Sequence, residues 1–342
     1  LFDGLAFFST GRRFRKLGHE RQQELLRQWE ADPALGPLLQ AFGFALKFAH
    51  FDRQDVYEAY GGKLNVVENL EQPRWLEQVV DADTLTEAED VECEVVVIGT
   101  GAGGAVVGKE LADRGYAVCF VEEGVHVRRD RFTGSSVAAH RDFYRGSVAL
   151  GNAPFPVFMG RMVGGSTAVN GGTCFRTPPW VLDRWCEETF SDDFSPVNMD
   201  SRFTKVERTV GVAPANARFI GPIQDVFRRG CDALGWSHFT IMRNAPGCEG
   251  TGFCDFGCRT DARRSTNISY VPPALEKGAM LYTHLRAERV MLEGGRAVGV
   301  EGVSPRGRRL RVRAKAVVLA GGAVPTPLFL LRQGLCNSSG QL

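Results

Sequence analysis

One stretch decides the fold class of this chain: Val95-Val96-Val97-Ile98-Gly99-Thr100-Gly101-Ala102-Gly103-Gly104. Its first four residues are apolar and β-branched, which is typical of a strand that lies inside a parallel sheet. The glycines follow the pattern G-x-G-x-x-G, and the apolar residues after them predict a helix that ends near Gly115. Ala117–Val121 is expected to be the second strand. Together these segments predict a β-α-β unit that binds a dinucleotide.

The glycines of this unit have separate expected roles. Gly99 permits a tight turn, Gly101 lets a diphosphate approach the main chain, and Gly104 lets the helix pack closely on the strand. The helix N-terminus offers free N–H groups and the positive end of its dipole to an anion. All six residues from Gly99 to Gly104 are therefore candidate cofactor-binding residues.

A carboxylate closes the second strand of the predicted unit. Glu122 stands about 20 residues after the loop, where an acid accepts hydrogen bonds from the adenosine ribose and repels a 2′-phosphate. Glu123 is adjacent, but Glu122 has the better position at the strand end. This unit by itself does not distinguish FAD from NAD.

Two longer motifs make that distinction. Residues 160–172 read GRMVGGSTAVNGG, and residues 322–331 read GAVPTPLFLL. In this order after the β-α-β unit, they resemble the two characteristic motifs of the glucose–methanol–choline (GMC) oxidoreductases. The resemblance covers about residues 95–342 and implies an FAD-dependent oxidoreductase that acts on CH–OH groups.

The resemblance also implies which residues lie beside the flavin. The first motif contributes Gly160, Gly164, Gly165, Ser166, Asn170 and Gly171. The bare main chain of Gly164–Ser166 is expected to offer successive N–H groups, which would form an anion-binding concavity. The strand around Val290 resembles the family's adenine-side strand, so the main chain of Val290 is expected to touch the base.

Within the family, the chain most resembles the bacterial branch near the long-chain alcohol oxidases. The text from Cys248 to Cys258, with RRSTN after it, and the helical front segment carry this resemblance. It implies long-chain or apolar alcohols as substrates, ahead of sterol-like or sugar alcohols. Oxygen or an electron carrier would then accept the electrons.

Three cysteines, Cys248, Cys254 and Cys258, fall within eleven residues and leave three interpretations open. Thiolates at this spacing can hold an iron–sulfur cluster, and the spacing resembles the cluster loop of the family's dehydrogenases. A zinc site would need a fourth ligand. The third interpretation is a glycine-rich loop without metal. Arg259 stands where the cluster loop has a proline, which favours the last one.

The family's general base, a histidine, is expected beyond residue 342, so no catalytic residue is assigned. Removal of the hydroxyl proton needs such a base, and we expect these 342 residues alone to oxidise no alcohol. Two alternatives share the first motif or the flavin site. One is an NAD-dependent dehydrogenase or flavin disulfide reductase, and the other is a non-catalytic flavin-binding fragment.

The predicted fold class is α/β, with a doubly wound, Rossmann-like FAD-binding domain. Residues 1–90 are expected to be a helical N-terminal segment in which 81–92 is a solvated linker. Residues 91–173 and 281–342 are expected to form the incomplete FAD-binding domain, with 174–280 inserted as part of a substrate domain. Late strands are predicted at 289–292, 296–303, 310–313 and 316–320, followed by a helix with Thr326 as its N-cap.

Composition sets the remaining expectations. The formal net charge of +1 gives no field that favours nucleic acid. Nine cysteines in no secreted pattern indicate reduced thiols and a cytoplasmic location. The apolar stretch 34–51 is too short and too polar for a membrane span and is expected to be a buried or interfacial helix, so peripheral membrane contact is a further hypothesis.

Overall fold

The computed structural model describes residues 2–62, 70, 72–146, 148–150 and 154–335. The chain divides into two compact units, residues 1–63 and 64–342. Cys336 and the final residues 337–342, which end the chain in the sequence, lie outside the described residues. Among the helices of the described part, none is both long and apolar enough to cross a bilayer.

The N-terminal unit, residues 1–63, is helical as expected, but the helical segment was predicted to reach residue 90, and residues 79–81 and 89–90 belong to strands of the second unit. It contains α1 (Phe2–Thr10), α2 (His19–Ala31), α3 (Leu35–Phe51) and α4 (Gln54–Ala59). Ala6, Leu25 and Trp29 form its small buried core, and Leu35 and Leu39 of α3 pack against that core. Asp32 ends α2 and its carboxylate accepts hydrogen bonds from the first N–H groups leading into α3, which fixes the turn between the two helices.

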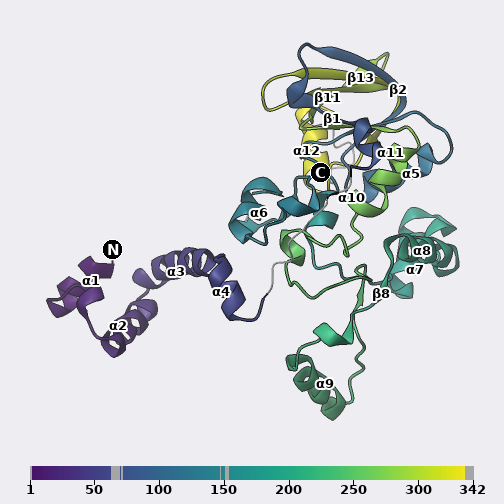
Figure 1. The fold of residues 1–342 in the computed structure, drawn as a ribbon. Helices are drawn as coiled ribbons and strands as arrows, with labels where there is room; N and C mark the ends of the chain where they lie inside the picture. Colours follow the sequence, from purple (N-terminus) through teal and green to yellow (C-terminus); the bar gives the residue numbers. More distant parts are fainter. Residues whose placement is uncertain (1, 63–69, 71, 147, 151–153, 336–342) are drawn as a thin grey trace. The chain divides into compact units, whose positions relative to one another are not determined.

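The second unit is built on a seven-stranded sheet with the order β1-β10-β3-β2-β13-β12-β11 (Figure 1). The strands are β1 (Val79–Asp81), β10 (Met280–Thr283), β3 (Val118–Val121), β2 (Glu89–Ile98), β13 (Arg309–Leu319), β12 (Arg296–Val303) and β11 (Arg286–Glu293). The first five are parallel in this order, whereas β13, β12 and β11 form an antiparallel meander. The predicted α/β class is confirmed.

The central strands of this sheet are apolar, because helices or other chain segments cover both of their faces. Val97 of β2 and Phe120 of β3 pack on one face with α5 (Ala102–Ala112) and α11 (Val271–Glu276). Val96 and Val121 face the opposite side, where they form a second core. The β2-α5-β3 connection is the β-α-β unit expected from the sequence.

Smaller elements follow β3 in the sequence, most of them before β10. The helices are α6 (Ser136–Asp142), α7 (Pro179–Thr189), α8 (Pro196–Val210), α9 (Ile223–Leu234) and α10 (Thr266–Ser269), and α12 (Pro325–Arg332) follows β13. Short strand pairs are β4 (Tyr144–Arg145) with β7 (Met159–Gly160), β5 (Val148–Leu150) with β6 (Pro154–Pro156), and β8 (Ala213–Pro214) with β9 (Met242–Arg243).

Three local predictions are wrong. The two strands expected at 310–313 and 316–320 are one strand, β13, because it pairs with β2 along its whole length. The expected linker 81–92 contains the end of β1 and the start of β2, since Glu89–Glu92 continue the pairing with β13. Thr326 lies inside α12, whose N-cap is Val324, because Pro325 already occupies its first turn.

The two-sided burial of the sheet gives a prediction on stability. Leu281 in β10 has no exposed surface, whereas Leu292 in β11 is 46% exposed. We expect Leu281→Ala to lower the free energy of unfolding by about 2–5 kcal/mol, because the cavity it leaves is enclosed. The control Leu292→Ala should change it by about 0.5 kcal/mol or less. Urea unfolding followed by circular dichroism measures both, and equal losses would contradict this core.

Candidate cofactor site

The glycine loop lies between the end of β2 and the start of α5, and two of its glycines are required by the fold itself. Gly99 has a φ of +95°, and a Cβ there would lie 2.5 Å from the main-chain oxygen of Ala320. A Cβ on Gly104 would lie 2.0 Å from the main-chain oxygen of Gly99. Helix and strand are therefore in direct main-chain contact, as the motif predicts.

Gly101 differs from these two glycines. Its φ is −68°, which any residue can adopt, and a Cβ there would meet no protein atom within 4 Å. The space over Gly101 belongs to a cavity of about 1180 Å³. Nothing in the protein requires a glycine here, so the bare main chain is available to a ligand.

This cavity collects segments that are far apart in the sequence. It is lined by the loop 98–103, the end of β3, residues 157–167, the start of β11, and residues 319–329. The predicted residues that it brings together are Gly99, Thr100, Gly101, Ala102, Gly103, Glu122, Gly160, Gly165 and Ser166. The predicted residues that do not line it are Gly104, Gly164, Asn170, Gly171 and Val290.

Glu122 is buried at the end of β3 and faces the glycine loop. Its Oε2 accepts hydrogen bonds from the N–H and the hydroxyl of Thr100, at 3.0 and 2.6 Å, and its Oε1 accepts one from the N–H of Gly124 at 2.9 Å. Burial raises the pKa of Glu122, and these donors oppose that rise. A carboxylate has about four lone-pair sites, so one remains for a ligand.

Thr100 joins the loop to two other segments. Its hydroxyl accepts a hydrogen bond from the N–H of Gly164 at 3.0 Å, and its carbonyl accepts one from the hydroxyl of Thr266 at 3.0 Å. Thr266 also shares a hydrogen bond of 2.9 Å with Thr167. The first GMC-like motif is thereby held against the glycine loop by residues of the inserted region.

The prediction that successive free N–H groups at Gly164–Ser166 form an anion-binding concavity is wrong. The N–H of Gly164 is donated to Thr100, and that of Gly165 to the carbonyl of Met162 at 2.7 Å. These two donors are therefore already used inside the protein. The glycines are needed instead for conformation, since Gly164 and Gly165 have φ values of +98° and +51°.

Asn170 and Gly171 organise the end of the same motif. The side chain of Asn170 donates to the carbonyl of Ser166 at 3.0 Å and accepts from the N–H of Gly172 at 2.8 Å. The carbonyl of Gly171 accepts hydrogen bonds from the guanidinium of Arg243 at 2.6 and 3.1 Å. In the described structure both residues shape the loop and neither lines the cavity.

The structure does not place Val290 at the cavity. Its N–H donates to the side chain of Gln333 at 2.7 Å, so this group is not free for a base. Residues Leu285–Glu288, at the start of the same strand, line the cavity instead. Val290 itself therefore does not line the cavity, whereas the start of its strand does.

The sequence reasoning missed several charged residues of the site. Arg145 in β4 pairs with Glu123, and Arg161 and Arg286 line the same cavity. Arg161 belongs to the motif at residues 160–172, so its position in the sequence could have identified it as a site residue. Arg145 lies in a region without periodic pattern, so nothing in the sequence marked it.

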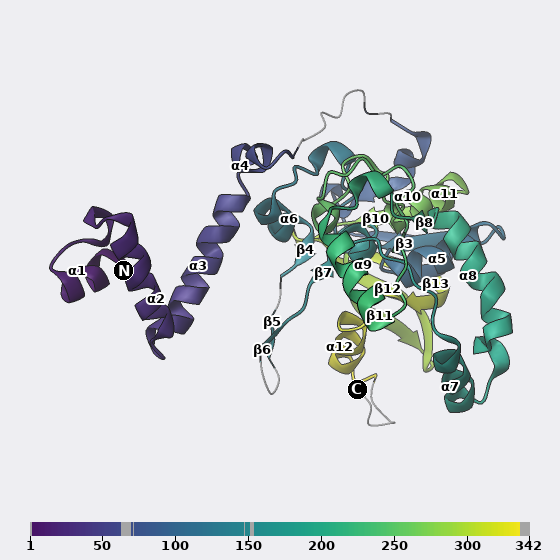
Figure 2. The ribbon, with the colours of Figure 1, turned by 90° about the horizontal axis from the view of Figure 1, so that it is seen from below.

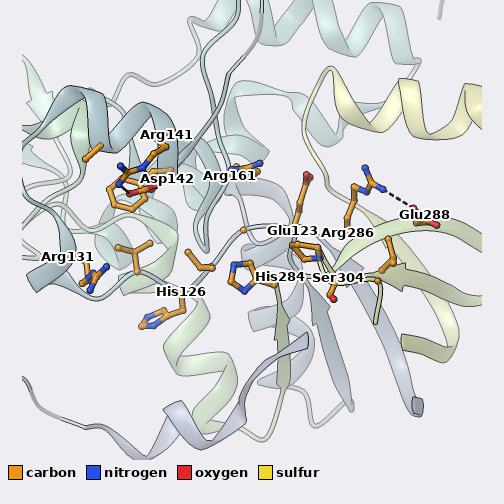
Figure 3. Close-up of a pocket in the computed structure, with 18 of the residues that line it drawn as sticks. Glu123, His126, Arg131, Arg141, Asp142, Arg161, His284, Arg286, Glu288 and Ser304 are labelled. Carbon is orange, nitrogen blue, oxygen red and sulfur yellow. Dashed lines mark hydrogen bonds and ion pairs between the residues drawn. The ribbon is translucent and has the colours of Figure 1, made fainter. Parts of the chain in front are cut away.

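Figure 3 shows a second cavity, of about 1310 Å³, which shares lining residues with the first. Its wall is rich in ion pairs: Arg141 pairs with Asp142 at 2.6 Å, and Arg286 with Glu288 at 2.9 Å. The shared residues are Glu123, Arg161, Arg286 and Glu288. The two cavities therefore adjoin at a charged border next to Glu122.

The three cysteines surround a guanidinium group. Arg243 donates to the Sγ of Cys254 at 3.1 Å, the N–H of Gly250 to Cys248 at 3.4 Å, and the N–H of Arg263 to Cys258 at 3.4 Å. Within the described part of the chain, the one trio of ligand atoms within 4.8 Å of one another is Asp81, Asp83 and His284. The sulfurs of Cys248, Cys254 and Cys258 do not form such a trio, so they are not placed to hold a single metal ion between them.

A buried cation lies behind this loop. Arg263 is 2% exposed, and its guanidinium donates to the carbonyls of Ala168, Asn170 and Cys254. Burial lowers the pKa of Arg263, and the nearby thiols and Asp255 oppose that fall. Arg263 therefore fastens the cysteine loop to the end of the first motif.

Comparisons with known proteins identify the family to which the chain is similar. The model of a family described as GMC oxidoreductase matches residues 75–341. A GMC-type oxidoreductase of Mycobacterium tuberculosis is 38% identical, with 75% of this chain and 40% of that protein covered. The long-chain-alcohol oxidases FAO4B and FAO3 of Arabidopsis thaliana are 31% and 27% identical, with 72% and 95% of this chain and 35% and 50% of theirs covered.

Solved structures show the same fold. Pyridoxine 4-oxidase from Mesorbium loti superposes with a TM-score of 0.58 at 18% identity, over 70% of this chain and 51% of that one. Formate oxidase superposes with a TM-score of 0.53 at 16% identity, over 72% and 48%. The chain spans about half, or less, of the length of the relatives it matches.

Gly104 and Gly101 differ in the space that surrounds them, and this difference predicts different stabilities for their alanine variants. We expect Gly104→Ala to lower the free energy of unfolding by about 2–3 kcal/mol or more, because its methyl group collides with the main chain of Gly99. Gly101→Ala should change it by about 0.5 kcal/mol or less. Urea unfolding of both variants without added cofactor measures this difference. Equal stability of the two variants would refute the close helix–strand contact.

A pH dependence follows from Asp261, beside the cysteine loop. Burial raises the pKa of Asp261 to about 6, although Arg129 and Arg264 oppose the rise. The folded state then binds more protons than the unfolded state between about pH 4 and 6, so this group lowers stability as pH rises through that range. Asp261→Asn should stabilise the protein near neutral pH by on the order of 1–2 kcal/mol, after screening by solvent.

Unfolding of the parent and Asp261→Asn in a pH series tests this. The gain should shrink as pH falls through 6 and vanish near about 4. A gain that is constant across the series would argue against the titration of Asp261.

Proposed function

The chain belongs to the GMC oxidoreductase family, and on that premise we propose that it binds FAD and contributes the cofactor-holding part of an alcohol-oxidising enzyme. The observation that carries the proposal is the cavity over Gly101. Gly99 and Gly104, which packing requires to be glycine, flank Gly101, whose main chain is open to the cavity. The buried carboxylate of Glu122, which has one unused lone pair, lies beside it. These features suit the diphosphate and the adenosine ribose of a dinucleotide.

Each part of the cavity has a proposed role. Main-chain N–H groups at Gly101–Gly103 and the N-terminus of α5 would face the diphosphate. Glu122 would accept a hydrogen bond from a ribose hydroxyl, and main-chain groups at Leu285–Glu288 would lie along the adenine. Residues 160–166 and 321–325 would line the remainder of the cofactor.

Bound FAD supplies an acceptor for the hydride that leaves the alcohol carbon. The residues of this chain hold and orient the cofactor and exclude water from its diphosphate. No histidine of the described residues lines the cavity. We propose that the base that takes the hydroxyl proton is contributed from outside these 342 residues, and that they alone oxidise no alcohol.

The proposed substrates are long-chain or otherwise apolar primary alcohols, with oxygen or a carrier as electron acceptor. The relatives named long-chain-alcohol oxidases support this class, as does the helical N-terminal unit, since the match with FAO3 covers 95% of this chain. Eight described cysteines are free, which supports a reducing, cytoplasmic location.

A dehydrogenase with an iron–sulfur cluster on Cys248, Cys254 and Cys258 is the alternative. The N–H donors that face each sulfur favour it, because hydrogen bonds to the sulfurs are a regular feature of cluster sites in proteins. The cationic guanidinium of Arg243 lies near all three sulfurs and donates a hydrogen bond to that of Cys254, which favours an oxidase without a cluster there. Iron analysis of anaerobically purified protein distinguishes the two, since the oxidase should contain no stoichiometric iron.

Flavin binding is tested with a glycine pair. Gly101→Ala should raise the dissociation constant of FAD by about tenfold or more, because its methyl group occupies the space proposed for the diphosphate. Gly221→Ala is the control, since its Cβ also meets no neighbour within 4 Å but lies away from the cavity. Titration of the apoprotein with FAD, followed by flavin fluorescence, measures both constants.

Two outcomes would contradict the proposal. If Gly101→Ala holds FAD as tightly as the parent, the diphosphate does not lie over the loop. If the parent binds NAD and refuses FAD, the chain belongs with the nicotinamide-dependent dehydrogenases in function.

A further inference from the structure

We propose that the second cavity, of about 1310 Å³, binds a phosphate group, which arrives either as free phosphate or on a small phosphate ester. Residues from the segment 123–143, Arg161, and sheet residues between His284 and Arg309 line this cavity. The roles proposed for FAD involve the other cavity, so the phosphate site goes beyond the proposed function and does not rest on it.

Helix α6 and the segments next to it bring three arginines to the cavity wall. Arg141, near the end of α6, donates two hydrogen bonds to Asp142, of 2.6 and 2.7 Å. Arg131 precedes α6, and Arg161 directly follows β7, which pairs with β4 beside that helix (Figure 2). Figure 3 shows Arg131, Arg141 and Asp142 on one side of the cavity, opposite Arg286.

Two of these three arginines have no acidic partner of their own. Neither Arg131 nor Arg161 forms an ion pair or a side-chain hydrogen bond with any residue that the structure describes. Hydrogen bonds from Arg141 lower the pKa of Asp142. The charges of Arg131 and Arg161 lower this pKa further, so all three cations lie near one acid. Three positive charges therefore face one negative charge, which leaves a surplus of two.

The other acids that line the cavity do not neutralise this surplus. Each of them already forms an ion pair with another cation: Glu123 with Arg145, Glu288 with Arg286, and Asp130 with Arg128. On the sheet side, Arg309 shares the carboxylate of Glu301 with two further arginines. The unbalanced charge of the lining is therefore positive, and an anion is the ligand that complements it.

Phosphate matches this cavity better than a carboxylate does. A guanidinium group donates paired hydrogen bonds to phosphate oxygens, and a phosphate ester carries a charge of about −1.5 to −2 at pH 7. That charge matches the surplus, whereas a carboxylate carries a single negative charge. The cavity is also larger than a phosphate group, and Val125, Val127 and Phe143 give part of its lining an apolar surface. We expect the remainder of an ester to lie on these side chains.

The experiment is calorimetric titration of the FAD-saturated protein with inorganic phosphate and with phenyl phosphate, in a phosphate-free buffer of low ionic strength. We expect both to bind, and acetate to bind about tenfold more weakly or less. Tighter binding of phenyl phosphate identifies an ester as the ligand, whereas equal affinities identify free phosphate.

Variants that change the charge in opposite directions should change the affinity in opposite directions. Arg131→Gln removes one unpaired cation and should raise the dissociation constant of phosphate about tenfold. Asp142→Asn removes the competing carboxylate and should lower that constant about threefold or more. The control is Arg114→Gln, which should leave the constant unchanged. Like Arg131, Arg114 is exposed and has no ion pair among the described residues, but it lines neither cavity.

Several results would overturn this site. They are a parent that binds neither phosphate, equal losses in Arg131→Gln and Arg114→Gln, and weaker binding by Asp142→Asn. If FAD abolishes binding that is seen without it, the phosphate lies over Gly101 in the cofactor cavity instead. Circular dichroism should show the same fold for the parent and all three variants, because the altered side chains are not part of a core.

Failure of the proposed function is distinguishable from failure of this site. If the protein binds no FAD, the proposed function fails. The same titration is then made with the FAD-free Gly101→Ala variant, whose added methyl group occupies the space over the loop of the cofactor cavity. Phosphate binding that persists in this variant and is weakened by Arg131→Gln supports the second cavity, and its loss contradicts the proposal.

Discussion

The close contact between the main chains of Gly99 and Gly104 is the constraint on which the second unit depends. It brings the start of α5 against the end of β2 with no side chain between them, and the main chain of Ala320 closes the same junction from β13. Because these neighbours are main-chain atoms and cannot move aside, the junction fixes the helix relative to two adjacent strands, β2 and β13. The cavity over Gly101 is a result of that geometry, since the loop must bend away from the sheet to make the turn.

Thr100 extends this constraint to the rest of the site. Through Glu122 it is tied to the end of β3, through Gly164 to the first GMC-like motif, and through Thr266 to the inserted region. The bonds are buried, where a lost partner costs more than at the surface. The inserted region therefore supports the cofactor cavity, although none of its residues 174–280 lines it.

The sequence predicted the β-α-β unit, the parallel sheet and nine of the cavity's residues, because strand burial, turn geometry and motif spacing are local properties. It did not predict which hydrogen-bond or ion-pair partner each group has in the folded protein. The N–H groups of Gly164 and Gly165 were expected to be free, but they donate to Thr100 and Met162. Val290 does not line the cavity, and its N–H donates to the side chain of Gln333. Arg145 had no pattern around it, and its place beside Glu123 depends on the fold.

The strand order has a consequence for how the chain is made. The hydroxyl of Thr283 donates a hydrogen bond to the carbonyl of Val80, which lies 203 residues earlier in the chain. In the sheet, β2 lies between β3 and β13, and β13 is made much later. While the ribosome is still translating the inserted region, one edge of β2 has no neighbour and offers an apolar, unpaired template to other nascent chains. The acidic residues Glu89, Asp90, Glu92 and Glu94 at the start of this strand would keep such chains apart by repulsion until β13 emerges.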